Sequence, residues 1–318
     1  MNEPPAVLIG DIGGTNARFA LVRKSGLETL ARLSVADFSD PATALKEILS
    51  EVNVPVRVAL LAVAGPVQRS GTEKAGAELT NAGWKFDAKP LAETLGLEKV
   101  LLLNDFAAQA LALPQLTAED LVSLGGPTEA DPEAPRAVLG PGTGLGIAAL
   151  LPDDIPLVGE GGHATLAATT DEEADLLADL RRLYGHVSAE RVLCGDGLVT
   201  LYRTLGGNHA VTAADVTAAV RQQDPVAIEA LKFFFGFLGT VAGNVALTFG
   251  ARGGIYLTGG ILPRLVSEVS DAGLYERFVS KGRFRIYLEG IPLRLVIHSN
   301  PALLGLARQA RRLNLVSF

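Results

Sequence analysis

The sequence predicts layered α/β domains built on a duplicated core. Apolar, strand-like runs alternate with helical segments along the chain, which is the pattern of α/β proteins. A strand, a glycine-rich turn and a second strand follow one another at residues 7–22 and again at residues 137–151. With 318 residues, the chain has room for two domains.

The first half of the chain opens with a predicted hairpin. Residues 7–9 and 18–22 have the apolar character of strands, and the glycine-rich residues 10–15 between them predict a turn. A helix is expected at residues 41–52, because Asp40 suits the N-cap and a proline follows at the first helical position. Further elements expected in this half are strands at 56–64 and 99–103 and a helix at 106–113.

The second half repeats the hairpin after a predicted exposed loop. The loop is expected at residues 125–135, where glycine, proline and acidic residues dominate. Strands are then expected at 137–139 and 146–151, with the glycine turn 140–144 between them. The two similar hairpins are the reason for expecting a duplicated core.

A third glycine turn follows a predicted strand at residues 254–258 and precedes a helix near Pro263. The last helix, near residues 302–313, is expected to return to the first domain. The predicted domains are therefore a small α/β domain of residues 1–105 plus the C-terminal helix 301–318, and a large α/β domain of residues 106–300.

One apolar segment has two interpretations. Residues 233–250 carry no charge, and their GxxxG spacing is compatible with a transmembrane helix. The alternative is a central helix buried on all sides, where Gly236, Gly239 and Gly243 permit close backbone contact. Polar Thr240 and Asn244 suit a protein interior, and no second span accompanies this one, so a core helix is favoured.

The composition narrows the class of protein. A formal net charge of −7 argues against non-specific binding to nucleic acid or anionic membranes, which favour basic surfaces. The single cysteine, Cys194, cannot form an intrachain disulfide or a zinc cluster of thiolates. The first residues lack the basic and apolar regions of a secretory signal, so a cytoplasmic location is expected.

The strongest local motif is GDIGGTN at residues 10–16. Its glycines permit a tight turn whose N–H groups can hold phosphate, and Asp11 is suited to hold Mg²⁺ directly or through water. The alternative is a plain hairpin turn, which gains nothing from this combination of residues. The chain has no Walker motif, and its glycine turns lead into strands, which argues against a dinucleotide fold.

The second turn, at residues 140–146, becomes informative when it is paired with the first. Two glycine hairpins that face each other across a cleft can hold opposite sides of a polyphosphate. Asn104 and Asp105 lie where a predicted strand ends and a helix begins, so Asp105 could accept the proton of an attacking hydroxyl. Taken alone, capping of the following helix is the favoured role of Asp105.

A polar cluster is suited to a polyol. Residues 160–163 (EGGH) combine an acceptor, a donor and free backbone, although a lone histidine is as often structural. Glu190 by itself looks like a solvated carboxylate at the start of a capped helix.

Taken together, these segments resemble the bacterial ATP-dependent glucokinase family, within the actin-like, hexokinase and Hsp70 ATPase superfamily. The resemblance extends over nearly the whole chain. The segments that carry it are GDIGGTNARFAL, LTNAGW, NDFAAQALALP, GPGTGLG, GEGGH, HVSAERVL, LTGGILPR, KGRF and NPALLGLA.

The resemblance implies a two-domain actin-like (ribonuclease H-like) ATPase fold with an interdomain cleft. It implies transfer of the γ-phosphate of Mg-ATP to the 6-hydroxyl of glucose, and Asp105 matches the catalytic base, which overrides the capping preference. Family members are similar in forming homodimers. Residues matching the sugar ligands are Asn104, Asp105, Glu160, His163 and Glu190. Residues matching the nucleotide and magnesium ligands are Asp11, Gly13, Gly14, Thr15, Asn16, Gly142, Thr143, Gly144, Gly259 and Gly260.

Departures and alternatives remain at this stage. The segment Asn81-Ala82-Gly83-Trp84 lacks the histidine that the family often has after the asparagine, and the zinc motif of related sugar kinases and repressors is missing. A kinase for another hexose, such as mannose or fructose, fits the polar cluster equally well. A non-enzymatic sugar sensor or an actin-like filament protein fits less well, because neither explains Asp105 together with the sugar cluster.

Overall fold

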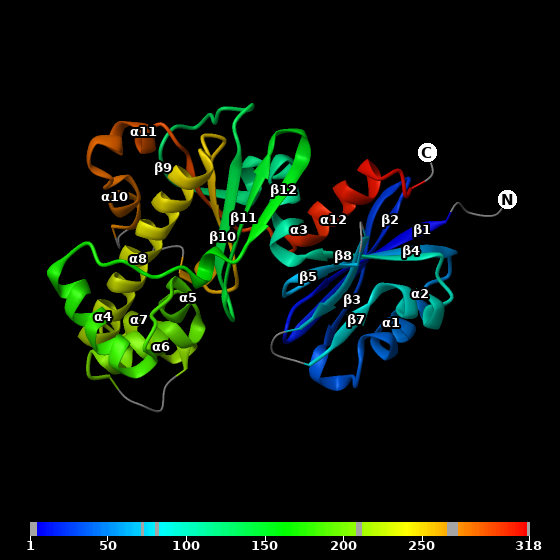
Figure 1. Cartoon of the computed structure of the whole chain (residues 1–318), viewed down its shortest axis with the longest axis horizontal. Coiled ribbons are helices and arrows are strands. Elements are labelled where there is room, and N and C mark those ends of the chain that lie inside the picture. Colours follow the sequence, from blue (N-terminus) through cyan, green and yellow to red (C-terminus); the bar gives the residue numbers. More distant parts are fainter. Residues whose placement is uncertain (1–4, 71–72, 80–82, 208–211, 266–272, 317–318) are drawn as a thin grey trace. The chain divides into compact units, whose positions relative to one another are not determined.

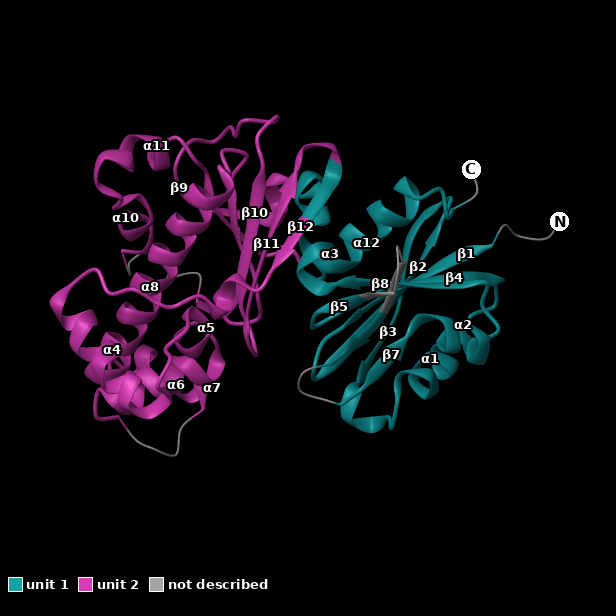
Figure 2. Cartoon of the chain, viewed as in Figure 1, with its two compact units in different colours: residues 1–116, 154–156, 299–318 teal, residues 117–153, 157–298 magenta. Residues whose placement is uncertain are grey.

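The computed structural model describes residues 5–70, 73–79, 83–207, 212–265 and 273–316 (Figure 1). The chain forms two compact units, each with its own sheet and core (Figure 2). Unit 1 consists of residues 1–116, 154–156 and 299–318, and unit 2 consists of residues 117–153 and 157–298.

Unit 1 differs from the expected small domain in three places. It continues past Asp105 to Leu116, it takes in the short segment Asp154–Pro156, and its C-terminal part begins at Ser299. The first difference arises because helix α3 (Asp105–Ala112) packs on helix α12 (Pro301–Arg312). A Cβ on Gly305 of α12 would overlap the carbonyl of Ala108, so these two helices meet backbone to backbone.

The main sheet of unit 1 has five strands in the order β3-β2-β1-β4-β8. As predicted, β1 and β2 form an antiparallel hairpin. Strands β1, β4 and β8 run parallel. The strands are β1 (Ala6–Ile12), β2 (Asn16–Arg23), β3 (Gly26–Ser34), β4 (Val56–Val63) and β8 (Lys99–Asn104). A small second sheet contains β5 (Val67–Ser70), β6 (Glu73–Glu78) and β7 (Lys85–Asp87), and the remaining helix is α2 (Ala88–Leu95).

Helix α1 (Pro41–Ser50) begins as its sequence predicts. The Asp40 carboxylate accepts hydrogen bonds from the backbone N–H and the hydroxyl of Thr43, both at 2.9 Å. These bonds lower the pKa of Asp40, since they favour its charged form. Pro41 occupies the first helical position, where its missing N–H costs nothing.

Unit 2 repeats this topology around a six-stranded sheet of order β12-β11-β10-β13-β14-β9. The hairpin β10–β11 corresponds to β1–β2, and β13 and β14 extend it in parallel as β4 and β8 do in unit 1. The predicted duplicated core is therefore confirmed. The strands are β9 (Leu121–Gly125), β10 (Arg136–Pro141), β11 (Leu145–Leu151), β12 (Ile155–Gly159), β13 (Ile255–Leu257) and β14 (Leu293–Val296).

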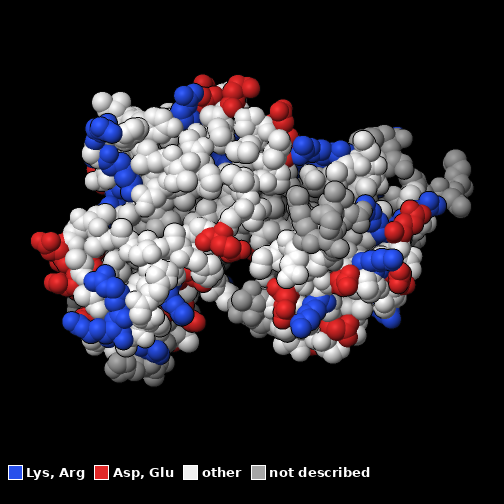
Figure 3. All heavy atoms as spheres, viewed as in Figure 1, with Lys and Arg blue, Asp and Glu red and all other residues white. Residues whose placement is uncertain are grey.

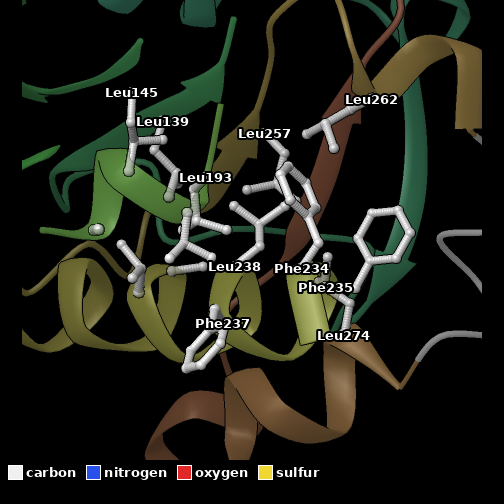
Figure 4. Packing of buried hydrophobic residues seen from close by; sticks show 14 of the residues in the cluster. Leu139, Leu145, Leu193, Phe234, Phe235, Phe237, Leu238, Leu257, Leu262 and Leu274 are labelled. Carbon is white, nitrogen blue, oxygen red and sulfur yellow. The ribbon is translucent and has the colours of Figure 1, made fainter. Parts of the chain in front are cut away.

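The long helix α8 (Pro225–Phe249) lies in the core of unit 2. It is long and apolar enough to span a membrane, but it is mostly buried, as the core-helix interpretation predicts. Figure 4 shows Phe234 and Leu238 of α8 beside Leu257 of the sheet. The other helices of this unit are α4 (Asp171–Tyr184), α5 (Ala189–Val192), α6 (Gly195–Thr204), α7 (Ala213–Arg221), α10 (Leu274–Val279) and α11 (Arg285–Glu289).

The glycines of α8 serve packing. A Cβ on Gly239 would lie 2.9 Å from the Cβ of Arg277, and one on Gly243 would lie 2.6 Å from the carbonyl oxygen of Phe278. Helix α10 can therefore approach α8 only because both positions are glycine. Near Pro263, where a helix is expected, the described residues Leu262–Leu265 form a 3-10 helix, and residues 266–272 lie outside the described part of the chain.

Charged side chains are spread in small groups over the face shown in Figure 3, with uncharged surface between them. One buried ion pair lies inside unit 2. Glu173 of α4 is 1% exposed and its Oε1 lies 2.8 Å from Nη1 of Arg277 on α10. The second oxygen of Glu173 accepts hydrogen bonds from the N–H and the hydroxyl of Thr169. Both oxygens of the buried carboxylate therefore have a partner.

Candidate active site

The predicted site residues of unit 1 gather at one edge of its sheet. Strands β1, β4 and β8 are parallel, and Ile12 pairs with Val63, which pairs with Asn104. The carboxyl ends of the three strands therefore meet at the same edge. Asp11 and Asp105 both lie there, two strand spacings apart, which is roughly 10 Å.

Asp11 is held by an arginine on the other strand of its hairpin. Asp11 and Arg18 are register partners, and Nη1 of Arg18 lies 3.2 Å from Oδ2 of Asp11. The Asp11 side chain is only 17% exposed. Burial raises the pKa of Asp11, and the charge and hydrogen bond of Arg18 partly oppose that rise.

The first glycine turn is closed by backbone bonds. The N–H of Gly13 donates to the carbonyl of Asn16 at 3.0 Å, and the carbonyl of Thr15 accepts from Val35 at 2.9 Å. The Asn16 side chain accepts from Nε of Arg32 at 3.1 Å. Neither Gly13 nor Gly14 adopts a left-handed φ, so the turn does not need glycine for its backbone conformation, contrary to expectation. What glycine provides at Gly13 is space, since a Cβ there would meet only a carbonyl oxygen at 3.4 Å.

Asn104 and Asp105 divide two roles between them. The side chain of Asn104 accepts from the N–H of Ala107 at 3.1 Å and donates to the carbonyl of Gly65 at 3.2 Å. Asn104 is therefore the N-cap of α3, and the capping role considered for Asp105 is wrong. Asp105 is the first helical residue, and it is half-buried at the sheet edge.

The second glycine turn lies at the matching edge of unit 2. The N–H of Gly142 donates to the carbonyl of Gly144 at 2.8 Å, and the carbonyl of Gly142 accepts from Gly195, where α6 begins, at 3.0 Å. Gly259 has a left-handed φ of 101°, and a Cβ there would overlap the carbonyl of Pro141. The third turn, which also contains the exposed Gly260, therefore packs directly against the second.

The polar cluster predicted from sequence is also in unit 2, beside this turn. Nδ1 of His163 lies 3.7 Å from Oε1 of Glu190, and its Nε2 lies 3.9 Å from Oε2 of Glu160. The other oxygen of Glu190 accepts from the N–H of Leu145 at 2.9 Å. His163 and Glu160 are about equally exposed, at 60% and 62%, whereas Glu190 is 31% exposed.

Local packing explains where the cluster lies. A Cβ on Gly162 would overlap the carbonyl of Leu145, so the 3-10 turn Gly161–His163 rests on β11. Helix α5, which carries Glu190, is capped by Ser188 and followed by the fully buried Leu193. Figure 4 shows Leu193 in the same core as Leu139 and Leu145.

The structure thus brings together two groups of predicted residues, one in each unit. Asn81 and Ala82 lie outside the described residues. The sequence analysis missed the Arg18 partner of Asp11, although the hairpin register could have revealed it. The contact of Glu190 with Leu145 was not predicted either, because these residues lie 45 positions apart and no local sequence pattern indicates the contact.

Few side chains of the site are suited to bind a metal ion. Over the described portion of the chain, no group of three or more His, Cys, Asp and Glu side chains is arranged to hold a metal ion. A single carboxylate beside a phosphate-binding turn suits Mg²⁺, which keeps several waters and phosphate oxygens as its other ligands. Asp11, a single carboxylate beside the first glycine turn, is therefore the candidate ligand for such an ion.

Comparisons with known proteins identify the family of the chain. A family model described as Glucokinase matches residues 8–313. The glucokinase of Nitrobacter hamburgensis is 44% identical over 311 residues, covering 94% of this chain and 95% of that protein. A crystal structure of glucokinase from an Antarctic psychrotroph is 36% identical, with a TM-score of 0.84, and covers 96% of this chain and 99% of that one.

A more distant structure shares the fold. The ROK family glucokinase from Streptomyces griseus, solved with glucose and AMPPNP, has a TM-score of 0.65 at 20% identity and covers 96% of this chain and 99% of that one. Since the family model extends over nearly the whole chain and the sequence identity reaches 44%, the chain belongs to the glucokinase family and has the two-domain actin-like fold of these sugar kinases.

Proposed function

We propose that this protein is a glucokinase, which transfers the γ-phosphate of Mg-ATP to the 6-hydroxyl of glucose and forms glucose 6-phosphate. The observation that carries the proposal is the cluster of Glu160, His163 and Glu190 against the second glycine turn. A cluster suited to bind a polyol and a turn suited to bind phosphate would thereby be adjacent within one unit. Membership of the glucokinase family supports the same activity.

The sugar is held by side chains whose chemistry matches hydroxyl groups. Glu160 and Glu190 accept hydrogen bonds from hydroxyls, and His163 between them donates or accepts. The side-chain oxygen of Asn104 accepts from Ala107, and one N–H of its amide donates to Gly65. The second N–H of the amide is the one that would donate to the sugar. A wrong sugar that left one of these groups unpaired would lose about 1–3 kcal/mol per group.

The nucleotide is held by backbone. Gly13, Gly14, Thr15 and Asn16 form the first phosphate turn of the proposal. The second phosphate turn consists of Gly142, Thr143 and Gly144, and the adenosine contacts come from Gly259 and Gly260. The space that glycine leaves at Gly13 and Gly142 allows the N–H groups to approach phosphate oxygens.

Asp11 is the residue that would hold Mg²⁺, with Arg18 fixing the position of its carboxylate. The bound cation would supply charge neutralisation at the phosphate oxygens. Only one carboxylate is needed, because water and phosphate complete the preferred octahedral shell.

Asp105 is the general base. The 6-hydroxyl oxygen forms a bond to the γ-phosphorus while the bond to the ADP oxygen breaks, and the hydroxyl proton passes to the Asp105 carboxylate. Phosphoryl transfer has a loose transition state, so the proton leaves late and the carboxylate needs no unusual basicity. The position of the Asp105 carboxylate therefore matters more than its basicity. The first turn of α3, which Asn104 caps, fixes that position.

The sugar preference and the assembly belong to this proposal. The exposed Glu160 and His163 would suit other pyranoses, so a mannose or fructose kinase is the second candidate. We further expect a cytoplasmic homodimer, as the resemblance to the glucokinase family implies. The net charge of −7 argues against binding to nucleic acid or anionic membranes.

The test is Mg-ATP-dependent phosphorylation of glucose, mannose and fructose by the purified chain. The proposal expects the highest kcat/KM with glucose. A higher value with mannose or fructose would reassign the substrate. Absence of phosphorylation of all three sugars, combined with measurable glucose binding, would replace the kinase by a sugar sensor.

A further inference from the structure

The Glu190 carboxylate contacts both the second glycine turn and the polar cluster of unit 2. Oε2 of Glu190 accepts from the N–H of Leu145 at 2.9 Å, and Leu145 directly follows the second glycine turn. Oε1 of the same side chain lies 3.7 Å from Nδ1 of His163. Glu160, the other carboxylate of the cluster, lies near His163 as well, but the structure gives it no bond to the turn.

We propose that Glu190 is a positioning residue for the second glycine turn as well as a sugar ligand, so that glucose and nucleotide binding are coupled through the Leu145 amide. The part of this inference that concerns sugar binding rests on the proposed function. The part that concerns the position of the turn depends only on the contact between Glu190 and Leu145.

Both ends of this contact are anchored in the same core. Leu145 is 4% exposed and Leu193, which follows α5, is fully buried in the same cluster. Figure 4 shows Leu145 and Leu193 close together in this core. A shift of the Glu190 carboxylate toward a sugar hydroxyl therefore acts on the Leu145 N–H, since neither backbone is free to follow.

The turn itself is short and closed. The N–H of Gly142 donates to the carbonyl of Gly144, and the carbonyl of Gly142 is tied to Gly195. At its far end Leu145 pairs with Pro141 across the hairpin, and the N–H of Leu145 donates to Glu190. Loss of that bond would leave the Leu145 N–H without its acceptor and allow the turn to relax.

The two glycines of the turn differ in what surrounds them. A Cβ on Gly144 would lie 2.5 Å from Oε2 and 3.2 Å from Cδ of Glu190. A Cβ on Gly142 would meet nothing nearer than the carbonyl oxygen of Gly144 at 4.0 Å. Neither residue has a left-handed φ, so alanine suits the backbone at both positions. Gly144→Ala therefore displaces the Glu190 carboxylate, and Gly142→Ala is its matched control.

The first experiment measures glucose affinity without nucleotide by calorimetry. We expect Gly144→Ala to raise the Kd for glucose roughly tenfold, because it displaces a proposed sugar ligand. Gly142→Ala should keep the glucose affinity of the unmodified chain and weaken only Mg-AMPPNP. Equal glucose affinities for the two variants would overturn the proposed link from the turn to the sugar.

The second experiment measures Mg-AMPPNP affinity without sugar in Glu190→Ala, Glu190→Gln and Glu160→Ala. Glutamine retains an oxygen that accepts from Leu145, so Glu190→Gln should bind Mg-AMPPNP as the unmodified chain does. Glu190→Ala should bind it several-fold more weakly, and Glu160→Ala should show no change. Thermal melting of each variant reports whether it is folded.

The outcomes separate the two proposals. Unchanged Mg-AMPPNP binding in Glu190→Ala contradicts the positioning role even where glucose is phosphorylated normally. Failure of the unmodified chain to bind glucose contradicts the proposed function, while the glutamine and alanine variants still test the positioning role through nucleotide. If Glu190→Ala does not fold, the Gly144→Ala and Gly142→Ala pair still tests the link between the turn and the sugar, and equal glucose affinities would overturn the coupling.

Discussion

Each unit places a carboxylate at the glycine turn of its hairpin, but the two units do so by different means. In unit 1 the carboxylate is Asp11, a residue of the hairpin itself, paired with Arg18 on the neighbouring strand. In unit 2 the hairpin has no acidic residue at this edge, and Glu190 reaches it from α5. The duplicated fold therefore separates its tasks. Under the proposed function, the local pair in unit 1 would hold a metal ion, whereas the carboxylate from α5 in unit 2 would connect the phosphate turn with the sugar.

The comparison predicts that unit 2 depends more strongly on long-range contacts, and Glu173→Ala tests this most severely. Removing Glu173 leaves Arg277 and Thr169 without their buried partner, so we expect a loss of about 3 kcal/mol in unfolding free energy. Glu172→Ala is the control, since its carboxylate is exposed and belongs to the same helical turn. Urea denaturation measures both, and equal losses would refute the role of the ion pair.

The third glycine turn gives a second test of contacts in unit 2. Gly259→Ala should cost about 2 kcal/mol, because φ is left-handed and a Cβ would overlap the carbonyl of Pro141. Gly260→Ala should be nearly neutral, since a Cβ there meets nothing within 4 Å. Thermal melting distinguishes them. A neutral Gly259→Ala would mean that the second and third turns are not in firm contact.

In unit 1 the corresponding test removes the partner of Asp11. Arg18→Gln should raise the KM for Mg-ATP by roughly two- to fivefold, a modest effect because Arg18 is partly exposed. Glucose affinity without nucleotide should not change. This is the opposite of Gly144→Ala, where the sugar affinity falls. If Arg18→Gln weakened glucose affinity as much as it raised the KM for Mg-ATP, the proposed difference between the two units would be wrong.

The smallest expected effect concerns a purely local feature of unit 1. Asp40→Ala removes the N-cap of α1 and should cost about 1 kcal/mol at pH 7. The pKa of Asp40 is lowered in the folded state, so its contribution is present above the unfolded pKa of about 3.9 and is lost as pH falls through the lower folded value. The difference in melting temperature between the two proteins should therefore be constant above the unfolded pKa and should shrink as the pH is lowered below it. A difference that stays constant below the unfolded pKa as well would contradict the charged cap.

Local features could be predicted from the sequence, and long-range partners could not. The two hairpins, the cap of α1 and the buried helix α8 follow from patterns within a few residues. The pairing of β14 with β9 and the bond from Leu145 to Glu190 join segments far apart in the chain, and no local pattern encodes such a contact. The cap of α3 was misassigned for a simpler reason. Asparagine and aspartate are both good N-caps, and here they are adjacent.

The central claim is that this chain is a glucokinase whose general base is Asp105, and the most direct test is Asp105→Asn. The substitution preserves shape, and Asn104 continues to cap α3, so the fold should persist. We predict a fall in kcat with glucose on the order of 10²–10⁴-fold, with the Kd for glucose nearly unchanged. A variant that keeps its turnover would contradict the account, because the proton of the 6-hydroxyl would then be accepted elsewhere.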